Sequence, residues 1–567
     1  MGGLLSGKYS NSGKRPAAKD PAPTTGDTTT PVPDTTSPVP VSDRVPVGVN
    51  IESLSDFSRL QPFVDMMKSA RVWGSASAPW DATVPTDAQG WPTTDAGVVV
   101  AIVTRDPGDD ASTYKYLTPG TYALRFTGKA TVAPVASSAS IANYAYDQTT
   151  NRSTADVVIG ADATQLMLSF RDTIGGVKDV SLRRPGYPDT QTFTNEFIQA
   201  AAPFGVFRLM DFLATNGNPT RTWAERTTPA SGSQTSAKGA AYEHAIQMAN
   251  ELGKDIWITI PAGADDDFIR QLATLLKNTL APGRVVYVEY SNELWNFIFS
   301  QTTVNMNAAV AESVAGDLSL TDGTPCTQAM YDAGTEPCNK YWSGFKRVGK
   351  RTAQISKFFK EVMGADAFNT RFRIVYSHQW ANRGISTETL KYMAKYHGPV
   401  STLVYGIAGA PYIGLPESIF TSETATVDTL LSSLEQDVTG NYYTAFKEGT
   451  PYTGANWTQP TQKALANYYG VKSMAYEGGN DMGQANANLT NKLLASKDPR
   501  MGTLTKNYLD QWFGCGNDVF MYFSLTSQWD RWGYWGLTNN PADLSGSKYT
   551  VAKEVAQSAR STLTTCR

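Results

Sequence analysis

Residues 285–296 read VVYVEYSNELWN, a stretch rich in Val and Tyr that ends in the polar residues Ser291, Asn292 and Glu293. Val and Tyr favour extended backbone, so the run predicts a β-strand over 285–290. Amphipathic helical patterns lie on both sides of this strand, at 266–280 and at 340–363. The order helix, strand, helix is typical of βαβ units built around a parallel sheet.

The same alternation continues along most of the chain. Further helical patterns lie at 237–252, 384–397 and 548–562. Eight strands are expected, and the other seven are at 47–51, 206–210, 256–260, 372–376, 402–405, 472–476 and 519–524. Eight such units predict an α/β fold, a closed (β/α)8 TIM barrel, in which the active site lies at the carboxyl ends of the strands.

The first two predicted strands are too far apart for an ordinary crossover. The residues between them show strands and turns without convincing helices, with short apolar runs at 98–103, 122–126, 157–159 and 166–170 and a turn at 106–109. We therefore expect a β-sandwich module at 79–189, inserted after the first strand of a catalytic barrel formed by 46–78 and 190–567. Two roles are compatible with this module: it binds glycan, or it is purely structural and forms one wall of the cleft.

Residues 1–45 are rich in Thr and Pro and have almost no large apolar side chains, which predicts a disordered linker. This segment lacks the apolar region of a signal peptide, so we expect that an export signal has been removed or replaced. No run of 18 apolar residues occurs, so no membrane span is expected.

The chain has four cysteines, and their positions favour two disulfides. Cys326 and Cys338 bracket one short polar loop. Cys515 precedes the last predicted strand and Cys566 follows the last helix, two points that meet at the bottom of a barrel. The pairs Cys326–Cys338 and Cys515–Cys566 imply an oxidising compartment, so we expect a secreted or cell-surface protein.

Charge and motifs exclude several classes of function. With 49 Lys and Arg against 52 Asp and Glu, the net charge of −3 gives no electrostatic reason to bind nucleic acid or an anionic membrane. The chain contains no His-Glu-x-x-His helix motif, no Gly-x-Ser-x-Gly elbow and no phosphate-binding Gly-rich loop. We expect a monomer without metal or cofactor. The aromatic content of 11% suits the apolar faces of sugars, although a large core would also contain many rings.

Two glutamates end predicted strands. Asn292-Glu293 follows the fourth strand, and Tyr476-Glu477-Gly478 follows the seventh. With these motifs the chain resembles clan A of the retaining glycoside hydrolases, over 46–78 and 190–567. The resemblance implies that Glu293 is the acid/base and Glu477 the nucleophile.

Cleavage of a glycosidic bond with retention needs both groups. One carboxyl group protonates the leaving oxygen and the other, about 5–5.5 Å away, attacks the anomeric carbon. We expect the two environments to separate the pKa values, raising that of Glu293 and leaving Glu477 ionised. The structural alternative is that either residue is a solvated glutamate at a strand end.

The same resemblance implies further substrate-binding residues. Asn292 would hydrogen-bond the sugar 2-hydroxyl, and Arg208 would keep the nucleophile ionised, unless it pairs with Asp211 instead. Tyr412 lies where the clan has a residue that hydrogen-bonds the nucleophile. It also implies that one tryptophan among Trp529, Trp532 and Trp535, after strand eight, is the floor of the sugar site. Trp295 and His378 are further candidates because they follow strands four and five.

The substrate class follows from the clan, which mostly cleaves β-linked glycans: a β-glucan, a β-mannan or a bacterial exopolysaccharide. A glycan-binding or adhesive protein that has lost catalysis is an alternative, and so is a transglycosylase. Long connections after strands four and six are compatible with an extended groove for internal cleavage and equally with a closed pocket for attack at chain ends.

Overall fold

The computed structural model describes residues 43–81, 83–103, 117–455, 459–483, 487–563 and Cys566. Most of the predicted linker at 1–45 and the predicted turn at 106–109 lie outside the described residues.

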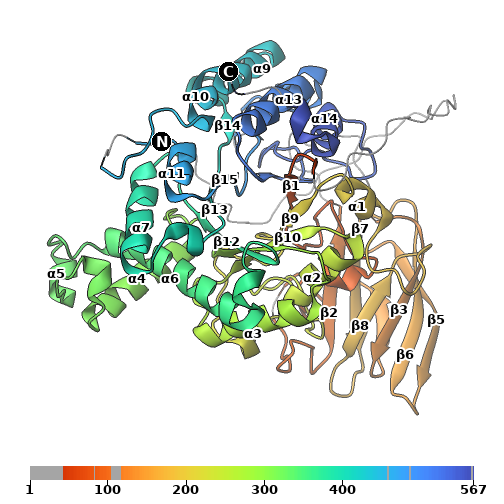
Figure 1. The fold of residues 1–567 in the computed structure, drawn as a ribbon. Helices are drawn as coiled ribbons and strands as arrows, with labels where there is room; N and C mark the ends of the chain where they lie inside the picture. Colours follow the sequence, from red (N-terminus) through yellow and green to blue (C-terminus); the bar gives the residue numbers. More distant parts are fainter. Residues whose placement is uncertain are drawn as a thin grey trace.

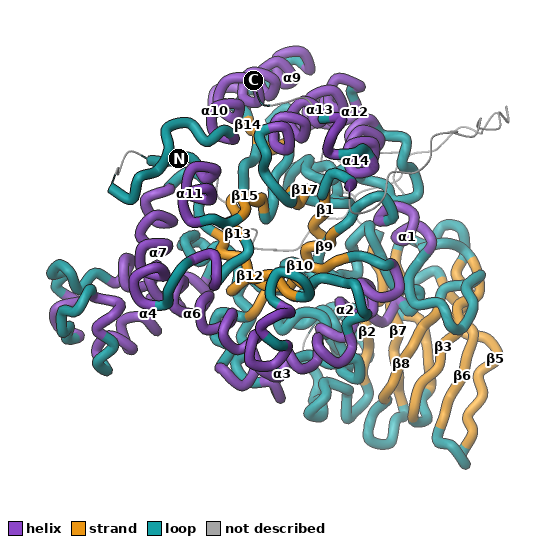
Figure 2. Tube along the Cα trace, in the orientation of Figure 1, coloured by secondary structure: helices purple, strands orange, loops and turns teal. Residues whose placement is uncertain are grey.

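Eight parallel strands form a closed barrel, as predicted, and Figure 2 looks into the ring that they make. Their order around the barrel is β1-β17-β15-β13-β12-β11-β10-β9. Each barrel strand thus pairs with the barrel strands before and after it in the chain, and the last strand, β17, pairs with the first, β1. The barrel strands are β1 (Val47–Asn50), β9 (Val206–Arg208), β10 (Asp255–Ile260), β11 (Val286–Tyr290), β12 (Phe372–Ser377), β13 (Gly406–Gly409), β15 (Lys472–Ala475) and β17 (Phe520–Tyr522).

Helices surround the barrel and bury one apolar face against it (Figure 1). In α3, for example, Phe268, Leu272 and Leu276 recur every four residues and are buried, and the side chain of Asp265 caps the helix by accepting from the Phe268 N–H at 2.7 Å. The helices are α1 (Asn195–Ala201), α2 (Tyr242–Leu252), α3 (Asp266–Thr279), α4 (Ser300–Val314), α5 (Gln328–Asp332), α6 (Lys340–Met363), α7 (Arg383–Tyr396), α8 (Glu417–Phe420), α9 (Val427–Gln436), α10 (Tyr443–Phe446), α11 (Gln462–Tyr469), α12 (Leu489–Lys497), α13 (Pro499–Gly514) and α14 (Ser547–Gln557).

One strand prediction is wrong. The sixth barrel strand is Gly406–Gly409, not 402–405. Gly and Ala have low strand propensity, so the preceding apolar run looks more strand-like in the sequence. Gly is nevertheless needed here, because a Cβ at Gly406 would lie 2.5 Å from Sδ of Met474 and one at Gly409 would lie 2.6 Å from Cε3 of Trp380.

Between β1 and β9 the chain forms two antiparallel sheets, which lie beside the barrel in Figure 1. They have a core of their own, in which the rings of Phe126 and Phe170, one from each sheet, are 5.3 Å apart. The sheets are β2-β7-β4 and β5-β6-β3-β8, with bounds β2 (Ala96–Ile102), β3 (Gly120–Thr127), β4 (Thr131–Pro134), β5 (Ala139–Asp147), β6 (Arg152–Ile159), β7 (Gln165–Arg171) and β8 (Lys178–Arg183). That 79–189 acts as a separate module stays a prediction.

Two tryptophans fix the segment next to these sheets to the barrel. Trp73 Nε1 donates to the carbonyl of Gly232 at 3.0 Å, and Trp91 Nε1 donates to that of Ala230 at 2.9 Å. Both acceptors lie in the connection that follows β9. The sheets are therefore held against a loop at the carboxyl end of the barrel.

A small parallel sheet extends two barrel strands beyond their carboxyl ends. Its strands are β14 (Ile413–Gly414) and β16 (Asn480–Asp481). They follow β13 and β15 in the chain and hold the segments around Tyr412 and Glu477 close to each other.

Both predicted disulfides are present, Cys326–Cys338 and Cys515–Cys566. Within the described ranges, no helix is both long and apolar enough to cross a membrane.

The two disulfides should differ in their effect on stability. Cys515–Cys566 spans 51 residues and Cys326–Cys338 only 12. Loop-closure entropy predicts losses of about 4 and about 3 kcal/mol respectively when each pair is replaced by serine. Denaturant unfolding of the double variants Cys515→Ser/Cys566→Ser and Cys326→Ser/Cys338→Ser should show this order. A larger loss from the shorter loop would contradict it.

Candidate active site

Glu293 and Glu477 lie just past the carboxyl ends of β11 and β15 and are largely buried, with 9% and 5% of their surface exposed. The backbone turns sharply before the first of them, because Ser291 and Glu293 both have left-handed φ values, 59° and 45°. Non-glycine residues rarely adopt this conformation, and it is concentrated at functional sites. The turn is held by a hydrogen bond from the Ser291 N–H to the carbonyl of Ile260 at 2.8 Å.

The two oxygens of Glu293 each accept one hydrogen bond from a neutral donor. Tyr476 donates its hydroxyl to Oε1 at 2.9 Å, and Asn296 donates its amide to Oε2 at 2.9 Å. Tyr476 directly precedes Glu477 in the chain. One tyrosine therefore links the end of β15 to the carboxyl group that follows β11.

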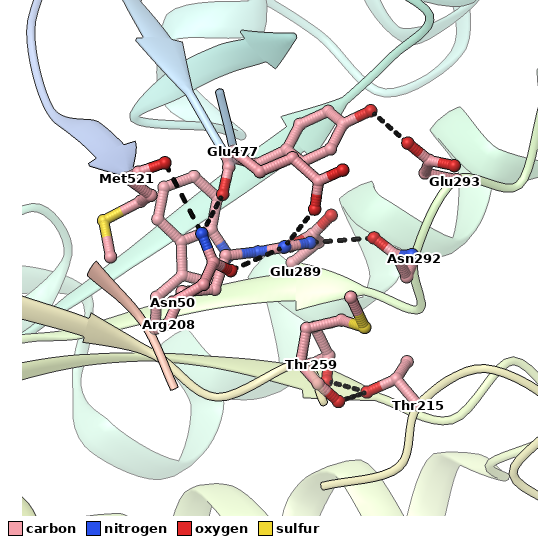
Figure 3. A network of polar contacts seen from close by, with 12 residues as sticks. Asn50, Arg208, Thr215, Thr259, Glu289, Asn292, Glu293, Glu477 and Met521 are labelled. Atoms are coloured by element: carbon pink, nitrogen blue, oxygen red, sulfur yellow. Dashed lines mark hydrogen bonds and ion pairs between the residues drawn. The ribbon is translucent and has the colours of Figure 1, made fainter. Parts of the chain in front are cut away.

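Arg208, fully buried at the end of β9, lies at the centre of the site (Figure 3). Its Nη1 donates to Glu477 Oε2 and to Asn50 Oδ1, both at 3.1 Å. Its Nη2 donates to Glu289 Oε2 at 3.0 Å and to Asn292 Oδ1 at 2.8 Å. The predicted contact between Arg208 and Glu477 is thus present in the structure, and the guanidinium is shared with Glu289.

Strand register explains how these side chains meet. Asn50 on β1, Arg208 on β9 and Trp257 on β10 are register partners on adjacent strands. Trp257 Nε1 donates to Glu289 Oε2 at 2.8 Å, so that carboxylate oxygen binds both the indole and the guanidinium. Glu289 was not among the predicted site residues. A charged residue inside the apolar run 285–290 was the signal for it, because a buried charge requires a partner.

Burial raises the pKa of both candidate catalytic carboxyl groups. The pKa of Glu293 is raised, and that of Glu477 is raised to about 8, by burial and then by the charge of Glu293, against the attraction of Arg208. Burial thus raises the pKa of both groups and not that of Glu293 alone, and the expectation that Glu477 is the ionised partner stays a prediction. Burial outweighs one guanidinium that is also shared with Glu289. At neutral pH this pair retains at least one proton.

Two more carboxyl groups lie close by, after β1 and β9. Burial raises the pKa of Glu52 to about 8 and that of Asp211 to about 6. Ser58 donates its hydroxyl to Glu52 Oε2 at 2.9 Å. The charge of Asp211 raises the pKa of Glu52 and also that of Glu477, so this side of the site is acidic.

Asn292 is held at both ends of its amide group. Its oxygen accepts from Arg208, and its Nδ2 donates to Asn216 Oδ1 at 3.1 Å. Gln301 supports the arrangement by donating to the same oxygen of Asn216 at 2.6 Å. An amide nitrogen carries two hydrogens, so Asn292 keeps one for a further acceptor such as a sugar hydroxyl.

Tyr412 lies next to the two glutamates. Burial and the charges of Glu477, Asp481 and Glu293 raise the pKa of its hydroxyl well above the ordinary value. Its ring contacts that of Phe523, with centroids 6.2 Å apart.

Phe523, which directly follows β17, was missed in the sequence. Its backbone N–H donates to the carbonyl of Gly478 at 2.8 Å, directly beside Glu477. Its ring also contacts Trp535 at 5.7 Å. Nothing in the residue type indicated this role, because the nearby tryptophans are the stronger sugar-binding signal.

The three tryptophans after β17 have different surroundings. Trp529 is only 4% exposed, its Nε1 donates to the carbonyl of Gly536 at 3.1 Å, and the ammonium of Lys548 lies 4.5 Å from its ring centroid. Trp532 is 36% exposed, and Arg531 lies over its ring. Trp535, through its contact with Phe523, is the one that the structure connects to the candidate catalytic pair.

Two other candidates are not brought into this group. His378 is 1% exposed, its Nδ1 is 3.1 Å from the carbonyl oxygen of Gln379, and burial lowers its pKa to about 4. Trp295 packs against the buried side chains of Met306 and Phe345. These contacts are with groups other than the carboxyl groups of the site. In the part of the chain that the structure describes, no three His, Cys, Asp or Glu side chains are grouped to hold a metal ion.

No family model matches the chain, and no curated protein matches it either. Among solved structures it is similar to the GH51 arabinofuranosidase from Xanthomonas axonopodis pv. citri, at 13% identity over 60% of this chain and 62% of that one, with a TM-score of 0.33. It is also similar to a family 1 β-glucosidase from Thermotoga maritima, at 12% identity over 64% and 85% of the two chains and a TM-score of 0.33. An exo-β-agarase matches at 10% identity over 84% and 95%, with a TM-score of 0.29. Similarities this distant do not bear on activity or substrate.

Proposed function

We propose that this chain is a retaining glycoside hydrolase that cleaves β-linked polysaccharide, with Glu293 as acid/base and Glu477 as nucleophile. The observation that carries the proposal is the pair of buried carboxyl groups at two strand ends, joined through Tyr476. The end of the strands is where barrel enzymes have their active sites.

The partners of the two carboxyl groups suit the two roles. Glu477 faces the positive charge of Arg208 at 3.1 Å, whereas Glu293 accepts only from the neutral groups of Tyr476 and Asn296. A cation stabilises the ionised form of its neighbour. In the proposed enzyme the proton shared by the pair is therefore on Glu293 and the negative charge is on Glu477.

The reaction would proceed in two displacements. In the first, a Glu477 oxygen bonds to the anomeric carbon, the bond to the leaving oxygen breaks, and Glu293 gives its proton to that oxygen. In the second, Glu293 takes a proton from water, and the water oxygen bonds to the anomeric carbon. The ester bond to Glu477 then breaks, and both carboxyl groups return to their starting states.

The surroundings favour a neutral glycan. The chain has a net charge of −3, and Asp211 adds an acidic group near Glu477. β-Glucan, β-mannan and uncharged bacterial exopolysaccharide are the proposed substrate classes. Two disulfides favour an extracytoplasmic location, which is where such polymers occur.

A panel of these polysaccharides tests the function, with products separated by chromatography. Wild-type protein should release sugars from at least one polymer, and Glu477→Gln should lower turnover by several orders of magnitude while binding persists. Glu243→Gln removes a carboxylate that pairs with Arg226 away from the site and serves as the control. No product from any polymer, together with tight binding to one, would instead favour a non-catalytic glycan-binding protein.

The pH dependence of kcat/KM tests the roles of the pair. Activity requires one proton on the two carboxyl groups, and burial raises both pKa values, so activity should persist at neutral pH and fall at higher pH, when the pair loses its proton. In Glu293→Gln, assayed on an aryl glycoside whose leaving group needs no proton, this alkaline fall should disappear. An unchanged alkaline limb in that variant would assign the proton to another group.

Glu289 should act as a positioning residue through Arg208. Its charge raises the pKa of both Glu293 and Glu477. Glu289→Gln should therefore move the pH profile of kcat/KM to lower pH, and kcat should fall about tenfold or more because a buried ion pair is broken. Glu243→Gln is again the matched control. A loss of activity without any displacement of the pH profile would indicate a structural role only.

A further inference from the structure

Helices α4 and α5 and the first residues of α6 form an arm at the edge of the barrel, on one side in Figure 1. Two aromatic rings are exposed where the arm begins. Phe297 is 54% and Tyr341 45% exposed, and their rings meet edge to face with centroids 5.4 Å apart. Large apolar rings exposed side by side mark a binding surface.

These rings are directly connected to Glu293. Asn296, which donates to Glu293 Oε2 at 2.9 Å, is the residue before Phe297. In the proposed reaction Glu293 protonates the leaving oxygen, so the sugar on the leaving side of the bond lies next to Glu293. In that reaction Phe297, one residue beyond Asn296, and its ring partner Tyr341 would lie on the leaving-group side of the site.

A groove of about 690 Å³ lies on the arm, and Tyr341 is part of its lining. Its lining combines amide, carboxyl, ammonium and aromatic groups, including Asn307, Gln328, Asp332, Lys340 and Tyr341. Polar groups next to a ring suit a sugar, which has hydroxyl edges and an apolar face.

Ion pairs and a disulfide connect the arm to the barrel and close its loop. Glu312 of α4 forms ion pairs with Arg347 at 2.7 Å and Lys350 at 2.8 Å, both from α6. Arg347 also donates to the hydroxyl of Tyr290 at 2.9 Å, which ties the arm to the last residue of β11. The disulfide Cys326–Cys338 closes the loop that carries α5. Preorganisation of this kind favours binding.

We infer that this arm binds several sugar units on the leaving-group side of a neutral polysaccharide, so that the enzyme cleaves inside long chains. The inference rests on the proposed function. It selects the extended groove over the closed pocket, the two alternatives that the long connections after strands four and six left open.

The test compares two substrates of the double variant Phe297→Ala/Tyr341→Ala. One is the polymer that the wild-type protein cleaves in the panel, and the other is an aryl glycoside of the same sugar, whose leaving group ends at a single ring. The variant should lose about tenfold or more in kcat/KM on the polymer. Its kcat/KM on the aryl glycoside should be unchanged, because that substrate does not reach the arm.

Tyr468→Ala is the matched control, because Tyr468 is also an exposed tyrosine, 50% accessible, in edge contact with other rings. Equal losses on both substrates, or no loss on the polymer, would overturn the inference while the proposed function stands.

Absence of any product from wild-type protein on the whole panel would overturn the proposed function and this inference with it. A second readout needs no turnover: the migration of the Glu477→Gln protein in a native gel that contains the polymer. The polymer should slow this protein, and it should slow it less when Phe297→Ala/Tyr341→Ala is added.

Discussion

Arg208 brings a full positive charge into the interior of the barrel, where no surface of it reaches water. A guanidinium in such a place costs several kcal/mol in lost hydration unless acceptors surround it. Its acceptors come from three different strands or strand ends: Asn50, Glu289, Asn292 and Glu477. Satisfying this one cation therefore fixes the relative positions of β1, β9, β11 and β15, and with them the two glutamates of the candidate site.

Burial, together with the charge balance around this arginine, raises the pKa of the carboxyl groups Glu293, Glu477 and Asp211. Glu289 and Glu477 share its one positive charge, and Glu293 and Asp211 lie near without a direct contact to it. Several buried carboxyl groups around one cation cannot all be ionised at low cost, so protons are retained. The same excess of acid that disfavours an anionic ligand thus provides the proton that general acid catalysis would need.

Short-range patterns were sufficient for most of the fold. Runs such as 285–290 have both the residue types and the length of a buried strand, and the barrel follows from their number and order. The prediction of the sixth strand was wrong because Gly406 and Gly409 are needed for close packing. That packing depends on residues far away in the chain, which a short-range pattern does not include. The disulfide Cys515–Cys566 was predicted because barrel topology brings those two points together, and Cys326–Cys338 because the two residues bracket one short loop.

The site was predicted in its motifs and missed in its network. Glu293 and Glu477 directly follow predicted strands, so their position, their residue type and the resemblance to clan A together indicated them. Tyr476 and Phe523 act through contacts between residues of distant elements, which residue type does not reveal. Of the tryptophans, Trp529 is buried beneath Lys548, although in the sequence it resembles its two neighbours.

Gly406, the first residue of β13, also bears on how this barrel can change in evolution. The space that a side chain at Gly406 would need is filled by Met474 of the neighbouring strand. Gly406 has no left-handed backbone, so its identity depends on that neighbour and not on its own conformation. In related sequences the two positions should vary together. A larger residue at 406 should appear only with a smaller one at 474 and with a shift of the Lys472 carbonyl, whose oxygen would lie 2.9 Å from the added Cβ.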